Sequence, residues 1–465
     1  MTTVGSALFV LDAVLVLATW PFALWASRPN FGELFTTLGD PRGYIYPAAN
    51  LLTLYAMGLY RREAMVETLD TLTRIPLIVG MGCGASAVLS NLPSMLFDTP
   101  PLGGRDQALV FAVASVCFAA CAFAARPVVG ALVRRDYLRR SLLVMGAGIR
   151  SWELRHMLHR EGGSLSYDIT FLHDPALGEI DERLASDPTA KIAHVKDTDI
   201  LTVARRTDPD QIVVAPDDRR GMDLQGLLDC KKAGYPIVPY LTFVENEIRR
   251  VDLKRMELGW LVFSDGFVFT AMDRFLKRAF DLVVSSIVLL LTAPLLIGAM
   301  IAIRLDGPGP IFYRQDRVTI GGRVFPIFKL RTMRVDAERA GAVWAASGDA
   351  RITRVGGFLR RARIDELPQL LNILKGDMSF VSPRPERPMF VEELAQQIPL
   401  YKERHLVKAG LTGWAQINYP YGASVDDARS KLSYDLYYVK NFSILFDLVI
   451  LTQTLRAVLW PSGVR

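Results

Sequence analysis

The chain has 465 residues, of which 51% are hydrophobic and 22% are charged, and its formal net charge is +6. This length exceeds one ordinary domain, and the usual domain size suggests about three. Because so apolar a chain still carries many charges, its apolar residues must be concentrated in segments, which indicates a membrane protein with water-facing domains. Because the net charge is modest, we expect no nucleic-acid partner. The four cysteines lack the spacing of disulfide pairs or metal ligands.

Four predominantly apolar runs, residues 6–26, 44–60, 75–97 and 108–125, are each near the ~20 residues that cross a bilayer core. The first run lacks the flanks of a removable signal peptide, so we expect it to stay attached. The positive-inside rule places two basic clusters, and with them the N-terminus, in the cytoplasm. These clusters are Arg61, Arg62 and Arg74, and then Arg126, Arg134, Arg135, Arg139 and Arg140.

The segment from Ser141 alternates strand-like runs with helical patterns, which predicts a parallel, Rossmann-like sheet. Gly146, Gly148 and Asp174 fit part of a dinucleotide fingerprint, although Ser151 replaces its third glycine. A tight turn from strand to helix also needs glycines, so this motif has a purely structural interpretation as well. Because no TyrxxxLys pair is evident, we expect a regulatory, ligand-sensing or assembly domain.

A fifth apolar run, from Phe280 to Ile303, contains Pro294, which removes a backbone donor and bends or breaks a helix. Basic residues flank the run on both sides, namely Lys277 and Arg278 before it and Arg304 after it. The positive-inside rule favours the cytoplasm for both flanks. A kinked fifth span and a re-entrant hairpin are the two alternatives, and we favour the hairpin.

Two further strand-like runs meet at Gly321 and Gly322, which predicts a β-hairpin. In the second run Lys329 and Arg331 are two residues apart and should project from one face of the strand. Such a cation pair is suited to a diphosphate, but two solvated surface cations would give the same pattern.

The stretch "RARIDELPQLLNILKG" places Asp365 and Glu366 before a leucine-rich helix that Gly376 can end. In the simpler interpretation Asp365 is the N-cap and Glu366 favours the helix dipole. Neither role explains the arginines at 351, 354, 360, 361 and 363. A helix start rimmed by arginines is an anion site, and two carboxylates there could bind a divalent cation or attack phosphorus. We expect the arginines to keep Asp365 ionised.

Three later features add to this pattern. Arg384 lies between two prolines and could orient phosphate oxygens from a rigid turn. Trp414, in "GLTGWAQINYPYG", could hold a base, although packing is the more common role of a tryptophan. The final apolar stretch carries Asp447 and Arg456, which favours an interfacial or core helix over a span.

The motifs "KRAFDL", "FKLRTM", "RIDELPQLLNILKGDMSFVSPRP", "GLTGWAQIN" and "YDLYYVKNFS", with the proline-broken helix, resemble the bacterial sugar transferases. These are the monotopic phosphoglycosyl transferases, or polyprenyl-phosphate hexose-1-phosphate transferases. The resemblance covers about residues 273–465, and the preceding parts look like the family's long form. The family's helix break is often Ser-Pro, whereas this chain has Ala293-Pro294, so proline alone must bend the helix.

The resemblance implies four parts: transmembrane helices in 1–135, the Rossmann-like domain in 136–262, a linker and re-entrant helix in 263–304, and a mainly helical catalytic domain in 305–465. It further implies that the domains face the cytoplasm at a bacterial inner membrane. The domain would contact membrane lipids, among them the lipid phosphate that accepts the sugar phosphate. We also expect the protein to form a homodimer.

The implied reaction transfers a hexose 1-phosphate from a UDP-sugar, with UDP-galactose or UDP-glucose favoured, to undecaprenyl phosphate. Asp365 would become esterified to the phospho-sugar as UMP leaves, and the product would start exopolysaccharide, capsule or O-antigen synthesis. Asp365 and Glu366 would organise Mg²⁺, while phosphate or nucleotide would be bound by Lys329, Arg331, Arg360 and Arg384.

Two other functions remain as alternatives. A membrane-bound nucleotide-sugar dehydratase would need an intact cofactor loop and a catalytic tyrosine-lysine pair in the middle domain, and neither is evident. A non-catalytic sensor or scaffold for polysaccharide assembly would have no need for the Asp365-Glu366 pair.

Overall fold

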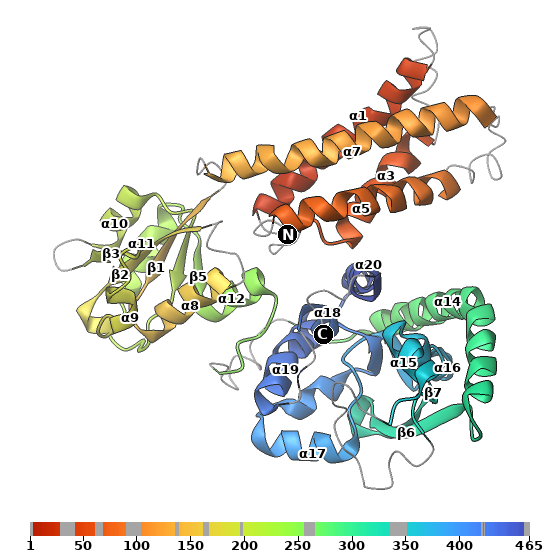
Figure 1. Ribbon diagram of the computed structural model, residues 1–465. Coiled ribbons are helices and arrows are strands. Elements are labelled where there is room, and N and C mark those ends of the chain that lie inside the picture. Colours follow the sequence, from red (N-terminus) through yellow and green to blue (C-terminus); the bar gives the residue numbers. More distant parts are fainter. Residues whose placement is uncertain are drawn as a thin grey trace. The chain divides into compact units, whose positions relative to one another are not determined.

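The structure, a computed structural model, describes residues 3–27, 42–60, 68–89, 104–134, 139–160, 167–195, 199–254, 266–334, 351–419, 422 and 424–459 (Figure 1). The chain divides into two compact units, Met1–Ile248 and Arg249–Arg465. The first unit contains a helical bundle and a sheet domain. The second contains the carboxylate pair.

The bundle consists of α1 (Thr3–Ser27), α3 (Arg42–Ala56), α5 (Thr68–Leu89) and α7 (Gly104–Arg134). Stretches of α1, α5 and α7 are long and apolar enough to cross a membrane. The run at 44–60 differs from its prediction, because α3 has 15 residues and residues 57–60 form a turn. A helix of that length falls short of the ~20 residues that span a bilayer core.

Arg126 was predicted to belong to a cytoplasmic basic cluster, and the structure places it elsewhere. Because α7 continues to Arg134, Arg126 lies inside the bundle, where its Nη1 is 3.1 Å from Asp12 Oδ1 of α1. The Tyr60 hydroxyl donates to the other Asp12 oxygen at 2.9 Å. Arg126 therefore pairs with a buried carboxylate and does not mark a cytoplasmic loop. Arg61, Arg62 and Arg135 lie outside the described residues.

The sheet domain confirms the predicted parallel sheet, whose strand order is β3-β2-β1-β4-β5. Its strands are β1 (Arg140–Met145), β2 (Tyr167–His173), β3 (Lys191–His194), β4 (Gln211–Val214) and β5 (Ile237–Pro239). Its α-helices are α8 (Ile149–Arg160), α9 (Glu182–Ala185), α10 (Ile200–Thr207), α11 (Leu224–Lys232) and α12 (Tyr240–Ile248). Alternate β1 residues pack into separate apolar clusters on the two faces, with Leu142 among α8 and α12 residues and Leu143 among α10 and α11 residues.

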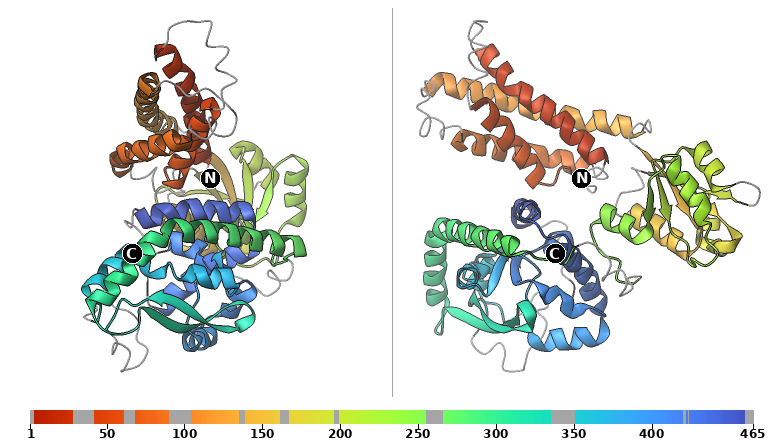
Figure 2. Two further views of the ribbon diagram at one scale, coloured as in Figure 1. Left: turned by 90° about the vertical axis from the view of Figure 1, so that its right-hand side faces the viewer. Right: turned by 180° about the vertical axis from the view of Figure 1, so that it is seen from behind.

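The second unit begins with α14 (Ala271–Asp306), in which Pro294 lies. Figure 1 shows that α14 bends sharply, and both views in Figure 2 show the same bend. Pro294 accounts for it, because proline lacks the donor for the preceding turn and its ring clashes with that turn. The outer surface of α14 is apolar and exposed, with Leu290 at 76% and Leu305 at 82%.

Both arms of α14 pack on the same unit. Phe280 and Val284 of the first arm contact the main core, whereas Ala299 and Ile303 of the second arm join a cluster with Leu359. The two basic residues that precede the apolar run of α14 also contact the domain. Lys277 Nζ lies 2.5 Å from Asp447, and Arg278 donates to the carbonyl oxygens of residues 373 and 374 at 2.6 and 2.7 Å. These contacts fix the first arm to the domain.

The rest of the unit surrounds two small sheets. The predicted hairpin is confirmed as the antiparallel pair β6 (Phe312–Val318) and β7 (Val324–Leu330), with positive φ at Gly321 and Gly322. A parallel pair consists of β8 (Met378–Val381) and β9 (Ala409–Thr412). The remaining α-helices are α15 (Arg354–Arg361), α16 (Gln369–Lys375), α17 (Pro388–Gln397), α18 (Trp414–Asn418), α19 (Val425–Lys440) and α20 (Ile444–Leu459). Short 3₁₀ turns, η5 (Ile364–Glu366) and η6 (Tyr401–Leu406), precede α16 and β9.

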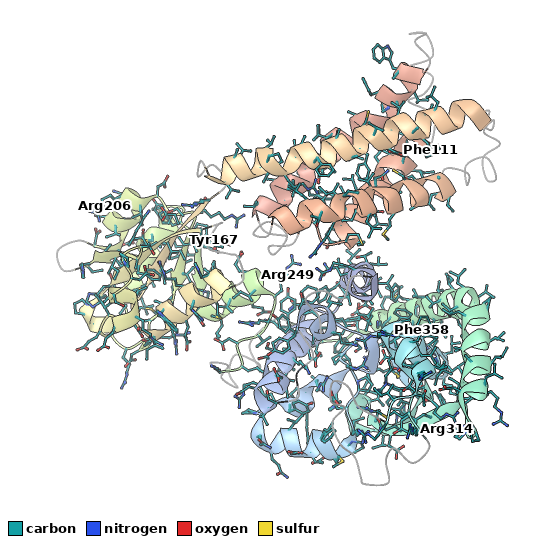
Figure 3. All side chains as sticks on the ribbon, in the orientation of Figure 1. Phe111, Tyr167, Arg206, Arg249, Arg314 and Phe358 are labelled. Carbon is teal, nitrogen blue, oxygen red and sulfur yellow. The ribbon has the colours of Figure 1, made fainter. Side chains whose placement is uncertain are left out.

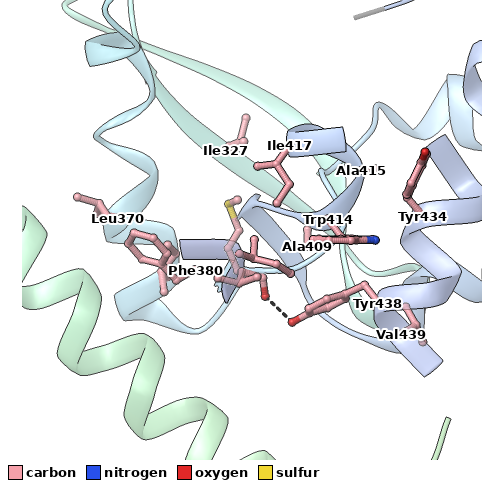
Figure 4. Packing of buried hydrophobic residues seen from close by; sticks show 14 of the residues in the cluster. Ile327, Leu370, Phe380, Ala409, Trp414, Ala415, Ile417, Tyr434, Tyr438 and Val439 are labelled. Atoms are coloured by element: carbon pink, nitrogen blue, oxygen red, sulfur yellow. Dashed lines mark hydrogen bonds between the residues drawn. The ribbon is translucent and has the colours of Figure 1, made fainter. Parts of the chain in front are cut away.

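The main core joins these elements around β8 and β9 (Figure 4). Trp414 is buried there, and its Nε1 donates to the Arg249 carbonyl at 2.8 Å, so its role is packing. Tyr438 donates to the Val381 carbonyl at 2.8 Å, as Figure 4 shows. Ile450 of α20 is also part of this core, while Leu445 of the same helix is exposed, in keeping with the predicted core or interfacial helix.

Candidate active site

The carboxylate pair does not cap a helix. Asp365 and Glu366 both lie inside η5, which follows Arg363 in the left-handed region at φ 57°. The N-cap of α16 is Pro368, and no side chain caps that helix. The prediction that Asp365 is the N-cap is therefore wrong, because the 3₁₀ turn places the carboxylates one turn before α16. Asp365 is buried although it caps neither η5 nor α16.

Glu366 is held by cations from separate elements. Its Oε1 accepts from Arg384 Nη2 at 2.5 Å and from Lys329 Nζ of β7 at 3.3 Å, and Arg363 Nη1 lies 3.9 Å from Oε2. Burial raises the pKa of Glu366, but the charges of Arg384 and Lys329 outweigh it and bring the pKa well below its ordinary value. Glu366 is therefore an ionised carboxylate that brings Lys329 and Arg384 together.

Asp365 differs from its neighbour. Burial, and then the Glu366 charge, raise its pKa, against the opposing charges of Lys329, Arg360 and Arg363. Arg360 and Arg363 do favour the charged form, as expected, but desolvation and the like charge of Glu366 outweigh them and raise the pKa above its ordinary value. Within the described part of the chain, no hydrogen bond or ion pair engages the Asp365 carboxylate.

Of the four predicted substrate-binding cations, two meet at Glu366 and two have other partners. Lys329 and Arg384 meet at Glu366, as described. Arg360 donates through Nε to the Thr332 hydroxyl at 3.0 Å. Arg331 lies beyond the end of β7 and donates to three carbonyl oxygens that follow the bend of α14, those of Ile303, Gly307 and Pro308, at 3.2, 2.7 and 2.7 Å. Arg331 therefore fastens the end of α14.

Sequence reasoning missed Arg404, which lies in η6 and donates to the Arg384 carbonyl at 2.9 Å. No motif marks it in "YKERHLVK". Arg404 stands within four consecutive polar residues, 402–405, a pattern that gives no local signal of burial. Only the fold brings it against the turn that carries Arg384.

A magnesium ion at the carboxylate pair would need several oxygen ligands. Among the described residues, no group of three His, Cys, Asp or Glu side chains could hold a metal. Mg²⁺ commonly binds through one or two carboxylates and completes its shell with water and substrate phosphates. Asp365 and Glu366 match that number of carboxylates, and Glu366 also binds Lys329 and Arg384.

In the sheet domain, the partial dinucleotide motif leads into α8, and an aspartate of the same chain binds the first N–H groups of that helix. Asp217 accepts from the backbone N–H groups of Ile149 and Arg150 at 2.6 and 2.9 Å. A Cβ on Gly148 would lie 2.0 Å from the same carboxylate, and Gly146 has φ +110°. These glycines thus permit a tight turn and a close carboxylate contact, which supports the structural interpretation of the motif.

Comparison with known proteins bears on the second unit. Residues 272–461 match the family described as bacterial sugar transferase. An Aeromonas hydrophila protein, described as UDP-N-acetylgalactosamine-undecaprenyl-phosphate N-acetylgalactosaminephosphotransferase, is 40% identical over 256 residues, which are 53% of this chain and 59% of that protein. An Escherichia coli protein, described as UDP-glucose:undecaprenyl-phosphate glucose-1-phosphate transferase, is 40% identical over 187 residues, 40% of each.

A Caulobacter vibrioides protein of the same description is 42% identical over 185 residues, which are 39% of this chain and 69% of that protein. The chain thus spans 59% and 40% of the length of the first two relatives.

Proposed function

The chain belongs to the bacterial sugar transferase family, and on this premise we propose that it transfers a sugar 1-phosphate from a UDP-sugar to undecaprenyl phosphate. The observation that carries the proposal is the buried Asp365 carboxylate, unengaged among the described residues, beside two cations gathered by Glu366. Phosphoryl transfer depends mainly on positioning and charge neutralisation, which Lys329 and Arg384 would supply, while Asp365 would be the nucleophile.

The reaction has two steps at one phosphorus. An Asp365 oxygen attacks the phosphorus that bears the sugar, the bond to the UMP phosphate oxygen breaks, and UMP leaves with that electron pair. An oxygen of undecaprenyl phosphate then attacks the same phosphorus, and the Asp365 carboxylate leaves. The product is undecaprenyl diphosphate sugar, and Asp365 is restored.

The chain's own residues prepare these steps. Lys329 and Arg384 would bind the donor's phosphate oxygens, and Arg360 would contribute from α15. Mg²⁺, when bound by Asp365, Glu366 and the donor, would neutralise phosphate charge. Burial and the Glu366 charge disfavour the charged form of Asp365, and the nearby cations Lys329, Arg360 and Arg363 favour it.

We propose that α14 enters and leaves the membrane on one side as a re-entrant hairpin. Its two arms pack on the same compact unit through Phe280 and Ile303, and one compact unit cannot lie on both sides of a bilayer. The exposed apolar surface of α14 suits the lipid, and Phe358 of α15, labelled in Figure 3, is exposed as well. The site would then lie at headgroup depth on the cytoplasmic side of the inner membrane.

This topology is testable with a cysteine at Glu392, an exposed position of α17. We expect a membrane-impermeant maleimide to label Glu392→Cys only after the inner membrane is permeabilised. Labelling in intact spheroplasts would refute the hairpin and favour the kinked span.

The donor remains a proposal within this function. UDP-glucose and UDP-galactose are favoured, and the Aeromonas hydrophila relative, whose name states N-acetylgalactosamine, makes UDP-N-acetylgalactosamine a third candidate. We also propose that the first unit's sheet is a Rossmann-like regulatory or assembly domain, because Asp217 fills its helix start. A homodimer remains a prediction.

The decisive experiment incubates the purified protein with each radiolabelled UDP-sugar and Mg²⁺, with and without undecaprenyl phosphate, and measures UMP and labelled lipid. Mass spectrometry of protein treated with donor alone should find the phospho-sugar on Asp365. Asp365→Asn should fold normally and lose both adduct and product, which would exclude a scaffold. Absence of UMP release with every UDP-sugar would refute the proposed function.

A further inference from the structure

The turn that carries Arg384 is held at successive carbonyl oxygens. The Pro383 carbonyl accepts from the Gly410 N–H at 2.8 Å, and the Pro385 carbonyl accepts from Arg317 Nη1 at 3.0 Å. Between them, the Arg384 carbonyl accepts from Arg404 Nη2 at 2.9 Å. The backbone of the residue that grips Glu366 is thus fixed by a side chain from η6.

Arg404 is itself held inside the domain. Its Nη2 lies 2.7 Å from Asp435 of α19, and the side chains of Arg404 and Asp435 are only 6% and 3% exposed. Its Nη1 donates to the Tyr401 hydroxyl at 2.9 Å. One guanidinium therefore joins α19, η6 and the Arg384 turn.

A buried ion pair is a poor means of adding stability, because removing both charges from water offsets much of their attraction. What a guanidinium adds over an apolar side chain is several donors in one fixed plane. In this domain Nη2 contacts both the Asp435 carboxylate and the Arg384 carbonyl, while Nη1 of the same plane is fixed by the Tyr401 hydroxyl. The arrangement defines where the Arg384 backbone lies, and through it where the Arg384 guanidinium meets Glu366.

We infer that Arg404, anchored by Asp435, is a positioning residue for the transfer reaction, acting through Arg384 on the carboxylate pair and the donor's phosphates. This inference rests on the proposed function. Arg404 does not touch the reacting atoms, so its effect on the reaction requires the Arg384 side chain.

A double-mutant cycle tests that dependence. Arg404→Lys keeps a cation beside Asp435, but its shorter side chain with a single nitrogen cannot hold Asp435, the Arg384 carbonyl and the Tyr401 hydroxyl as Nη2 and Nη1 do together. We expect Arg404→Lys to lower kcat/KM for UMP release on the order of 100-fold, the effect of misplacing a catalytic group by about 1 Å. In an Arg384→Ala background the same change should lower kcat/KM by less than about threefold, because the group it positions is gone.

The matched control is Arg429→Lys, on the surface of α19, where Arg429 pairs with the exposed Asp426 at 2.9 Å. It should leave kcat/KM unchanged. An equal loss from Arg404→Lys in both backgrounds, or no loss in either, would overturn the inference while leaving the proposed function intact. If Arg404→Lys does not fold, as judged by melting temperature, Asp435→Asn takes its place in the cycle, with the same two outcomes. A wild-type protein that releases no UMP from any UDP-sugar overturns both.

Discussion

Replacing Glu366 with glutamine removes one negative charge from the site with little change in shape. Glu366 contacts Arg384 at 2.5 Å and Lys329 at 3.3 Å, and all three side chains are largely buried. Hydrogen bonds to charged groups contribute about 1.5–3 kcal/mol each. Glutamine keeps one acceptor but brings an amide donor toward cations, so we expect a loss of about 3 kcal/mol. The exposed Arg363 contact, at 3.9 Å, adds little.

This free energy can be measured as a melting temperature of the purified protein in detergent. For a domain of this size, about 3 kcal/mol corresponds to a decrease of about 6–12 °C. The matched control is Glu392→Gln, because Glu392 pairs with Lys402 at 3.3 Å with both side chains more than half exposed. That substitution should cost less than about 1 kcal/mol. Equal decreases for the two variants would refute the reasoning.

The pH dependence offers a second check on Glu366. Because its pKa is lowered in the folded state, its contribution is present above the ordinary value of 4.5 and is lost as the pH falls further. Glu366→Gln lacks the contribution at every pH. The melting temperatures of wild type and Glu366→Gln should therefore converge in acid.

Two further predictions concern Arg331 and His405. Arg331→Met should lower the melting temperature by about 4–8 °C, from a loss of about 2 kcal/mol, because Arg331 donates to three carbonyl oxygens in and just after the last turn of α14. The KM for the UDP-sugar should stay unchanged. A raised KM with an unchanged melting temperature would instead favour a role of Arg331 in substrate binding. Burial, then the Arg404 charge, lower the pKa of His405 to about 4, so the folded protein binds fewer protons than the unfolded chain between pH 4 and 6.5. Acidification from pH 7.5 to 5 should destabilise wild type by about 2 kcal/mol relative to His405→Gln, seen as diverging melting curves, and parallel curves would contradict this.

Features with local causes were predictable from sequence. The β6–β7 hairpin followed from Gly321 and Gly322, and the end of α16 from Gly376, because glycine adopts positive φ without steric cost. The bend of α14 followed from Pro294. In the site, it was the resemblance that implied phosphate-binding roles for Lys329 and Arg384, and the structure places both cations on Glu366.

Features that depend on distant pairings were not predictable in the same way. The spacing of Lys329 and Arg331 fits a phosphate-binding face and a solvated face equally, and only the second arm of α14 supplies the carbonyl oxygens that Arg331 binds. The raised pKa of Asp365 reflects burial, which neighbouring arginines in the sequence do not reveal. Arg404 and Asp217 likewise gain their partners only after folding.

The buried pair between Asp12 and Arg126 has a consequence for how the bundle assembles during synthesis. Its two residues are separated by 114 positions, so α1 leaves the ribosome long before its partner exists. A lone carboxylate in the middle of an apolar helix costs on the order of 3 kcal/mol to insert. The first helix should therefore wait in the translocon, or beside an insertase, until α7 arrives, and truncated chains that end before α7 should be poorly retained in the bilayer.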